Sequence, residues 1–250
     1  MTHNENADAQ WRVIYQIGAT AALGAVLVGV LEIAITFLPG GNASQDTVLD
    51  WFALFAQNWF LGLRNLGLLN ILLNLLAVPA YFALYAAHRA TRYQPYAAFA
   101  ALVAFLGTGI FLATNRALPM LALSQQYAVA TTDVQRATLA AAAQTLLVVG
   151  ASHTPGTFLG FFLADLAGVL ISFVMLRSRV FGRPAAYAGM LGFGLLVVFE
   201  VLVSFVADLN APALTLAMFG GILSMVWYVL VARQLFQLAK EELSDKSAAQ

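Results

Sequence analysis

The sequence predicts an all-α protein, a polytopic bundle of six transmembrane helices with both termini on the cytoplasmic side. Two observations lead to this fold class: 61% of the 250 residues are hydrophobic and only 10% are charged, and six apolar stretches are long enough to cross a membrane. A soluble domain carries about 25% charged residues, and a span needs roughly 20 apolar residues to cross a hydrocarbon core about 30 Å thick. The chain therefore lacks the polar surface of a water-soluble protein.

The six predicted spans follow one another as a single transmembrane domain over residues 1–250. They cover residues 13–38, 66–87, 96–118, 157–176, 185–207 and 212–236. The first stretch is longer than the apolar region of a signal peptide, which has about 7–15 residues, so we expect it to remain as a helix. The polar ends 1–10 and 241–250 lack an apolar face, and we expect mobile tails there.

Two long connections on the side opposite the termini carry helix signals. Thr-Val-Leu-Asp at 47–50 matches a capping box, in which two side chains bond each other's backbone, and aromatic residues follow it. We predict an amphipathic helix over 47–64 in the headgroup layer, where aromatic rings gather. Thr-Asp-Val-Gln at 132–135 matches a second capping box, and we predict an outer-face helix over 132–149 that caps the bundle.

Basic residues divide unequally between the two sides of the predicted bundle. The nine on the side of the termini are Arg12, Arg89, Arg92, Arg177, Arg179, Arg183, Arg233, Lys240 and Lys246, and the three on the other side are Arg64, Arg116 and Arg136. Lysine and arginine are enriched in cytoplasmic loops. The asymmetry therefore predicts that both termini are cytoplasmic.

Polar side chains recur in the outer half of the predicted bundle. A charged side chain at the centre of a span costs about 2.5–3.5 kcal/mol on insertion scales, so acids kept there should face protein or water. Asp165 lies about 18 Å along its helix from Arg177, close to the midplane. We predict one cluster of candidate ligand-binding residues, consisting of Glu32, Arg64, Asn70, Asn74, Asn115, Arg116, Asp165 and Glu200.

Three functions of this cluster stay open. We favour binding, sensing or transport of a small polar or amphiphilic ligand, because a carboxylate at the depth of Asp165 cannot reach the membrane surface. An intramembrane hydrolase or transferase acting on a lipid is the first alternative, with Asp165 or Glu200 as general base and Arg116 binding an anion. A structural scaffold or subunit is the second, because asparagine side chains also hold helices together, for about 0.6–2 kcal/mol each.

Cofactor and metal motifs are missing from the sequence, and we predict neither. With no cysteine and three histidines, the chain offers no thiolate site, and its histidines are spread too widely for a zinc or haem site. His153 stands beside Ser152 and Thr154, but no nucleophile elbow is present, so we expect a surface histidine and name no catalytic residue. Enzyme activity is the less favoured reading.

Glycines inside the spans predict close helix packing rather than nucleotide binding. The run at 189–194 lies in an apolar span with no strand before it. The same interpretation applies to Gly107, Gly109, Gly168, Gly220 and Gly221. Lysine and arginine together number 12, as do aspartate and glutamate, and this zero net charge argues against a nucleic-acid partner. Membrane lipids and a small amphiphile are the expected partners, and the oligomeric state is not predicted.

The last three spans resemble a known family. The residues that carry the resemblance are Arg179-Val-Phe-Gly-Arg-Pro184, Ala186-Tyr-Ala-Gly189, Phe199-Glu200 and the segment 220–236. They look like the C-terminal half of a bacterial family of six-span membrane proteins, domain of unknown function 4386. The resemblance implies a six-helix protein of the bacterial cytoplasmic (inner) membrane, and it supplies no catalytic residues to carry over.

Overall fold

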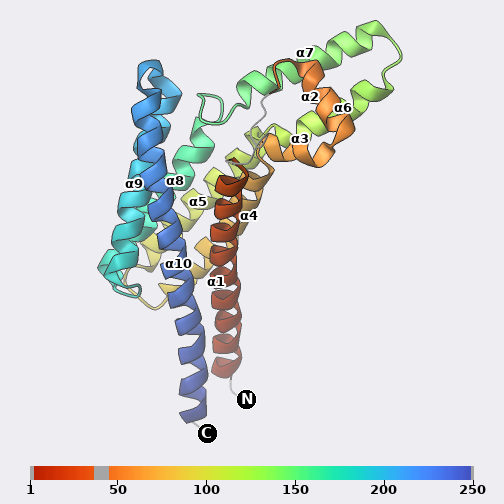
Figure 1. The fold of residues 1–250 in the computed structure, drawn as a ribbon. Coiled ribbons are helices and arrows are strands. Elements are labelled where there is room, and N and C mark those ends of the chain that lie inside the picture. Colours follow the sequence, from red (N-terminus) through yellow and green to blue (C-terminus); the bar gives the residue numbers. More distant parts are fainter. Residues whose placement is uncertain (1–2, 37–44, 249–250) are drawn as a thin grey trace.

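Six long helices form a closed ring in the computed structural model of the chain. The structure describes residues 3–36 and 45–248. Within these residues the ring helices are α1 (His3–Thr36), α4 (Leu68–Ala87), α5 (Gln94–Thr114), α8 (Phe158–Ser178), α9 (Arg183–Phe205) and α10 (Asn210–Ala248). Each packs against the next in this order, and α10 packs against α1, so the ring has an interior bordered by all of them. Figure 1 shows both termini at the same end of the bundle.

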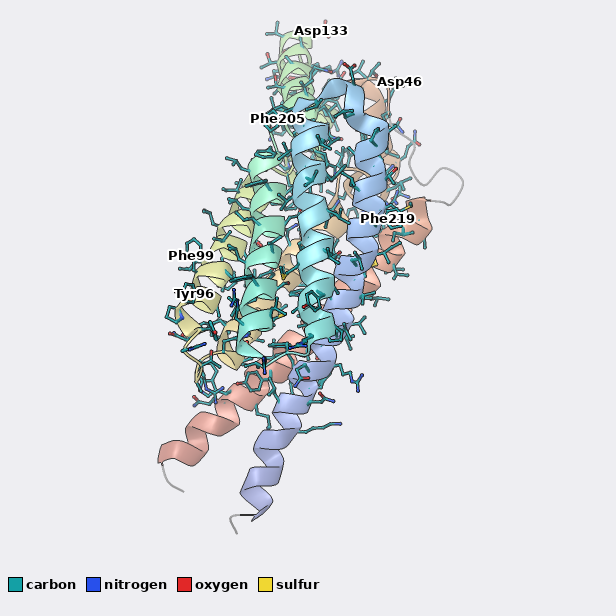
Figure 2. The ribbon with its side chains drawn as sticks, turned by 90° about the vertical axis from the view of Figure 1, so that its left-hand side faces the viewer. Asp46, Tyr96, Phe99, Asp133, Phe205 and Phe219 are labelled. Atoms are coloured by element: carbon teal, nitrogen blue, oxygen red, sulfur yellow. The ribbon has the colours of Figure 1, made fainter. Side chains whose placement is uncertain are left out.

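The ring helices carry apolar segments of membrane-spanning length. In the described residues these segments are Gln10–Ile35, Leu68–Ala87, Gln94–Val129, Phe158–Ser178, Arg183–Phe205 and Ala211–Lys240, of which the third continues past the end of α5 at Thr114. Large apolar side chains cover the outside of the ring, and Figure 2 shows Tyr96 and Phe99 pointing outward from α5. Lipid tails accommodate such a surface and water does not. The prediction of an all-helical integral membrane protein with six apolar helices is confirmed, while the side on which each terminus lies stays a prediction.

Basic and aromatic side chains meet at the end of the bundle where the termini lie. The guanidinium of Arg89 lies 4.8 Å from the centre of the Trp11 ring and donates a hydrogen bond to the Tyr15 hydroxyl. These contacts join the end of α4 to the start of α1. They place Arg89 at the same end of the bundle as Arg12. Both belong to the nine basic residues predicted to lie on the same side of the membrane as the termini.

His88 follows α4 at this end and is fully buried. Its Nδ1 donates to the Leu84 carbonyl at 2.7 Å, its Nε2 lies 3.0 Å from the Ser178 hydroxyl, and its ring stacks on Phe181. A neutral imidazole satisfies both contacts, because Nδ1 carries the proton and Nε2 accepts from the serine. Burial lowers the pKa of His88 below its usual value of 6.5.

We therefore expect the free energy of unfolding to fall as the pH drops below about 6.5. Above that pH, His88 is neutral in both states. Below it, the unfolded chain binds a proton that the folded chain does not, which lowers stability by up to about 1.4 kcal/mol per pH unit. Chemical unfolding of the wild type and of His88→Gln between about pH 5 and pH 8 tests this. An equal pH dependence in the two proteins would contradict the assignment.

Four shorter helices form a layer beyond the ring, at the end opposite the termini (Figure 1). They are α2 (Val48–Gln57), α3 (Trp59–Asn65), α6 (Ala117–Val129) and α7 (Asp133–Val149). Their core includes Trp51, Phe52, Phe55 and Met120. Both capping boxes expected from the sequence are present, before α2 and before α7. The position of this layer at the outer membrane face stays a prediction.

This layer differs from the sequence prediction in two details. The segment expected as one helix over 47–64 is divided at Asn58, whose side chain accepts from the Leu61 N–H and so begins α3. The helix α6 begins in the last residues of the span predicted over 96–118 and continues beyond every predicted element, because the backbone turns extended at Asn115, and the Asn115 side chain then accepts from the Ala117 N–H. The helix α7 packs against α6 and α2, and its place over the mouth of the bundle stays a prediction.

The chain ends also have more helix than predicted. The helix α1 begins at His3 and α10 continues to Ala248, so helical backbone occupies most of the segments 1–10 and 241–250. The mobility of these ends stays a prediction.

Glycines bring neighbouring ring helices into close contact. A Cβ added to Gly189 would lie 2.0 Å from the Ser172 Oγ, and one added to Gly192 would lie 2.9 Å from the backbone nitrogen of Ser224. The packing prediction is confirmed at Gly107, Gly168, Gly189, Gly192 and Gly220. It is wrong at Gly109, Gly194 and Gly221, where an added Cβ would meet nothing within 4 Å.

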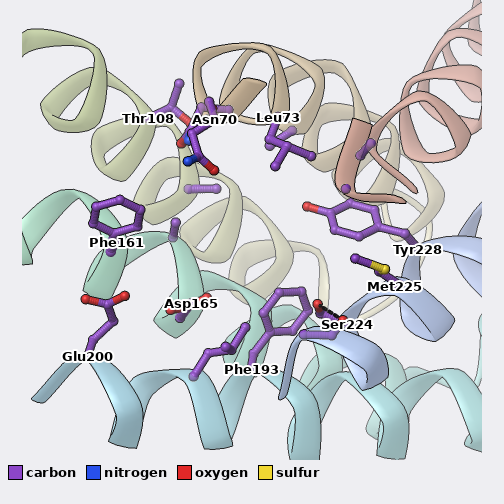
Figure 3. Close-up of a pocket in the computed structure, with 18 of the residues that line it drawn as sticks. Asn70, Leu73, Thr108, Phe161, Asp165, Phe193, Glu200, Ser224, Met225 and Tyr228 are labelled. Carbon is purple, nitrogen blue, oxygen red and sulfur yellow. Dashed lines mark hydrogen bonds between the residues drawn. The ribbon is translucent and has the colours of Figure 1, made fainter. Parts of the chain in front are cut away.

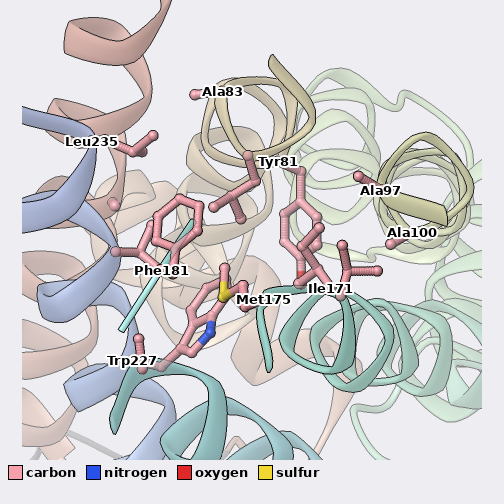
Figure 4. Packing of buried hydrophobic residues seen from close by; sticks show 14 of the residues in the cluster. Tyr81, Ala83, Ala97, Ala100, Ile171, Met175, Phe181, Trp227 and Leu235 are labelled. Atoms are coloured by element: carbon pink, nitrogen blue, oxygen red, sulfur yellow. The ribbon is translucent and has the colours of Figure 1, made fainter. Parts of the chain in front are cut away.

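Large side chains fill the half of the ring interior nearer the termini. Trp227, Met175 and Leu235 are fully buried there. Figure 4 shows Trp227, Met175 and Phe181 packed together between the helices. This core closes the interior toward the end of the bundle that carries His88.

Candidate functional site

Beyond this core, the ring encloses a cavity of about 280 Å³ (Figure 3). All six ring helices line it, each with residues three or four positions apart, a spacing that places them on one face of a helix. The interior is hollow at this level because many of the lining residues are small: Ala25, Gly29, Ala77, Ala104, Ala164 and Gly221. The cavity therefore follows from the sequence of small residues on the inner helix faces.

Asp165 is the carboxylate that α8 contributes to the cavity wall. It lies near the middle of the apolar helix Phe158–Ser178, yet its side chain is only partly buried. Among the described residues its carboxylate has no hydrogen-bond or ion-pair partner. Since Asp165 lines the cavity at this depth, the space beside it is where a partner would fit.

Glu200 enters the cavity from α9 and is bonded to a histidine. Its side chain is 2% exposed, and its Oε1 lies 2.6 Å from Nδ1 of His153. Its second oxygen, Oε2, is buried and has no hydrogen-bond partner among the described residues. Leaving a buried carboxylate oxygen unsatisfied is unfavourable by about 1–3 kcal/mol or more. One oxygen of the Glu200 carboxylate is thus hydrogen-bonded to His153, and the other is available to another group.

His153 belongs to the connection between α7 and α8 and adopts the left-handed backbone conformation, with φ at 57°. Its ring lies 4.4 Å from that of Phe161 and 5.0 Å from that of Phe199, measured between centroids. Next to it, the Thr157 hydroxyl donates to the Ala151 carbonyl at 2.8 Å, which holds the connection closed. The expectation of a surface histidine is wrong, because His153 lines the cavity and bonds Glu200.

The amides of α4 form the opposite side of the cavity. Asn70 and Asn74 are four residues apart and both line it, as the sequence predicted from their shared helix face. Asn74 donates from its side chain to the Asn70 carbonyl at 3.0 Å. Figure 3 shows the Asn70 amide pointing into the cavity, toward the side where Asp165 and Glu200 lie. Half of the predicted cluster is therefore brought together.

The other four predicted residues lie outside the cavity wall. Arg116 donates to the Leu147 carbonyl of α7, and Asn115 caps α6. Arg64 is buried in the outer layer, where it donates to Asn65, and its remaining nitrogens Nε and Nη2 have no described partner. Glu32 is partly buried on α1. The two arginines do not neutralise the carboxylates of the predicted cluster, because neither contacts Glu32, Asp165 or Glu200.

Acidic groups outnumber basic groups in the cavity wall. Asp165 and Glu200 are its acids and His153 its basic group, while no lysine or arginine is among the described lining residues. His153 is bonded to Glu200, so Asp165 is left without a basic partner in the described wall. Aromatic rings of Phe161, Phe193, Phe199, Tyr81 and Tyr228 make up much of the rest of the wall.

No protein-family model, no curated protein and no solved structure matches this chain.

Proposed function

We propose that this integral membrane protein binds a small polar or amphiphilic ligand in the cavity of its helix ring, for sensing or transport. The observation that carries the proposal is the unpartnered oxygen of Glu200, which is buried beside an unpaired Asp165 in an open space. Buried charged groups are normally paired and hydrogen-bonded. A ligand that pairs with these carboxylates would supply the missing hydrogen-bond or ion-pair partner.

The size of the cavity supports a small ligand. Ligand sites usually measure about 300–1,000 Å³, and this cavity of about 280 Å³ lies just below that range. Its wall of apolar and aromatic surface with few polar groups also follows the usual composition of such sites.

The two alternative functions have less support. A lipid hydrolase or transferase would use Arg116 to bind an anion, but Arg116 contacts Leu147 rather than the cavity. A scaffold would use its buried polar groups to hold helices together, and Glu200 Oε2 holds nothing among the described residues. Ligand binding accounts for both observations.

The cellular setting belongs to the same proposal. We infer a bacterial cytoplasmic membrane, with both termini cytoplasmic and the cavity in the outer half, from the distribution of basic residues and the family resemblance. Membrane lipids are then the surrounding partners, and membership of the six-span family is itself part of the proposal.

Filling the cavity should remove the bound ligand without unfolding the protein. Gly221 lines the cavity, and a Cβ added to it meets nothing within 4 Å. The Cβ of a leucine at this position therefore meets no clash, and we expect the rest of its side chain to occupy ligand space. Native mass spectrometry of the purified protein should detect a bound small molecule in the wild type and lose it in Gly221→Leu.

Gly194→Leu is the matched control for this experiment. An added Cβ at Gly194 also meets nothing within 4 Å, but this glycine does not line the cavity. The control should keep both the ligand and the unfolding temperature of the wild type. A wild-type protein without any bound molecule, or one whose ligand survives Gly221→Leu, would favour the scaffold instead.

A further inference from the structure

The cavity has an apolar neighbour on the lipid side of the ring. A groove of about 320 Å³ lies between α1 and α10 and is lined by Val26, Val30, Ile222, Val226, Val229 and Leu230 together with Met225. Val30 and Ile222 are about half exposed, with 50% and 53% of their surfaces accessible, and so face outward toward lipid. The groove is thus open to the hydrocarbon region of the membrane.

Met225 separates this groove from the cavity. It is the residue that lines both spaces. Its side chain reaches across from α10 to α1, because a Cβ on Gly29 would lie 2.9 Å from the Met225 Cε. Methionine has three rotatable bonds and adapts its shape readily. Rotating this one side chain would connect the carboxylates with the lipid phase.

The charged groups of the cavity wall determine whether a cationic or an anionic ligand binds. Asp165 and Glu200 present carboxylate oxygens without cationic partners from lysine or arginine in the described wall. An anion would be repelled, and a cation would gain the Asp165 carboxylate and the free Oε2 of Glu200. The surrounding rings of Phe161, Phe193 and Tyr228 favour an organic ammonium group, because aromatic faces attract cations and tolerate alkyl substituents.

We infer that the ligand is an amphiphilic organic cation, whose ammonium group lies beside Asp165 and Glu200 and whose hydrocarbon chain passes Met225 into the groove between α1 and α10. This inference rests on the proposed ligand-binding function and specifies its ligand class and entry route. The two spaces together match the two ends of such a molecule: a negatively charged aromatic cavity for the head and an apolar groove for the chain.

Three probes separate the parts of this inference. Dodecyltrimethylammonium carries both the cation and the chain, tetramethylammonium carries the cation alone, and laurate carries a chain with the opposite charge. Equilibrium dialysis against the protein in lipid nanodiscs measures binding, with empty nanodiscs giving the background of partitioning into lipid. We expect saturable binding of dodecyltrimethylammonium, weaker binding of tetramethylammonium and none of laurate.

Two variants test the head and the route separately. Asp165→Asn should weaken binding of both cations by about tenfold or more, because it removes the unpaired charge. Met225→Trp should block the junction and weaken binding of dodecyltrimethylammonium far more than binding of tetramethylammonium, and the remaining tetramethylammonium binding also shows that the variant is folded. Met218→Trp is its matched control, since Met218 lies on α10 with 57% of its surface exposed and lines neither space.

Each contrary result overturns a defined part. If laurate binds, and Asp165→Asn does not weaken its binding, the inference that the ligand carries a cationic head is wrong. The proposed ligand site would still stand in that case, provided that Gly221→Leu removes the native ligand. Unchanged dodecyltrimethylammonium binding in Met225→Trp would overturn the entry route. Absence of saturable binding for both cations would overturn the whole inference, and the mass-spectrometric experiment then decides the proposed function on its own.

Discussion

Replacing Gly192 with leucine should lower the free energy of unfolding by about 3 kcal/mol, the upper part of the usual range for overpacking. Gly192 lies close to the backbone of α10: an added Cβ would lie 2.9 Å from the backbone nitrogen of Ser224. On the facing helix, a Cβ on Gly220 would lie 2.9 Å from the Gly192 carbonyl oxygen. Backbone atoms cannot turn aside as a flexible side chain can, so the two helices must separate.

Gly194→Leu provides the control for this result. It makes the same change two residues along the same helix, where an added Cβ meets nothing within 4 Å. Unfolding in mixed detergent micelles, followed by tryptophan fluorescence, to which the buried Trp227 contributes, measures both variants. The control should match or slightly exceed wild-type stability, because glycine is unfavourable inside a helix by about 1 kcal/mol. Equal destabilisation by the two leucines would contradict the close packing of α9 and α10.

The bond between His153 and Glu200 should give the second large effect. Hydrogen bonds to charged groups contribute about 1.5–3 kcal/mol, and this bond is short, at 2.6 Å, with its glutamate buried. We expect His153→Ala and Glu200→Ala each to destabilise the protein, and the double variant to be about 2 kcal/mol more stable than the sum of the single effects implies.

A second cycle shows that the coupling is specific. Glu32 is a carboxylate on α1 that does not line the cavity, so His153→Ala and Glu32→Ala should be additive within about 0.5 kcal/mol. The same micelle unfolding assay measures all the variants. Additivity of His153→Ala with Glu200→Ala would mean that the two side chains do not interact in the folded protein.

The sequence predicts the fold well because its strongest signals are local. Apolar stretches of spanning length and the threonine caps at Thr47 and Thr132 depend on residues close together in the chain, and all of them reappear in the structure. The errors occur where one polar side chain redirects the backbone. Asn58 and Asn115 each end one helix and begin another, and periodicity alone does not distinguish such an asparagine from one inside a helix.

The candidate site is predicted in part because sequence position gives depth but not direction. Asp165, Glu200, Asn70 and Asn74 share both a level in the bundle and an inward helix face. Arg116 was predicted at the same level of the bundle, but it does not line the cavity. Which face of a helix points inward depends on packing between helices, and several apolar helices here have no strongly polar side that would reveal it.

His153 is the residue that sequence reasoning misplaced. It is 47 residues from Glu200 and has no motif around it. The available signal was positional: His153 comes just before the start of α8, and Glu200 lies near the end of α9, so the connection and the glutamate meet at the same end of an antiparallel helix pair.

The closure of the ring by α1 and α10 has a consequence for biosynthesis. A ribosome produces α1 first and α10 last, so the two walls of the groove at Met225 are separated by almost the whole period of translation. Asp165 and Glu200 enter the bilayer on α8 and α9 before the helix that completes their enclosure has been made. During that interval the half-built ring has to keep two carboxylates hydrated, and water sealed in by the arrival of α10 would be the first occupant of the cavity.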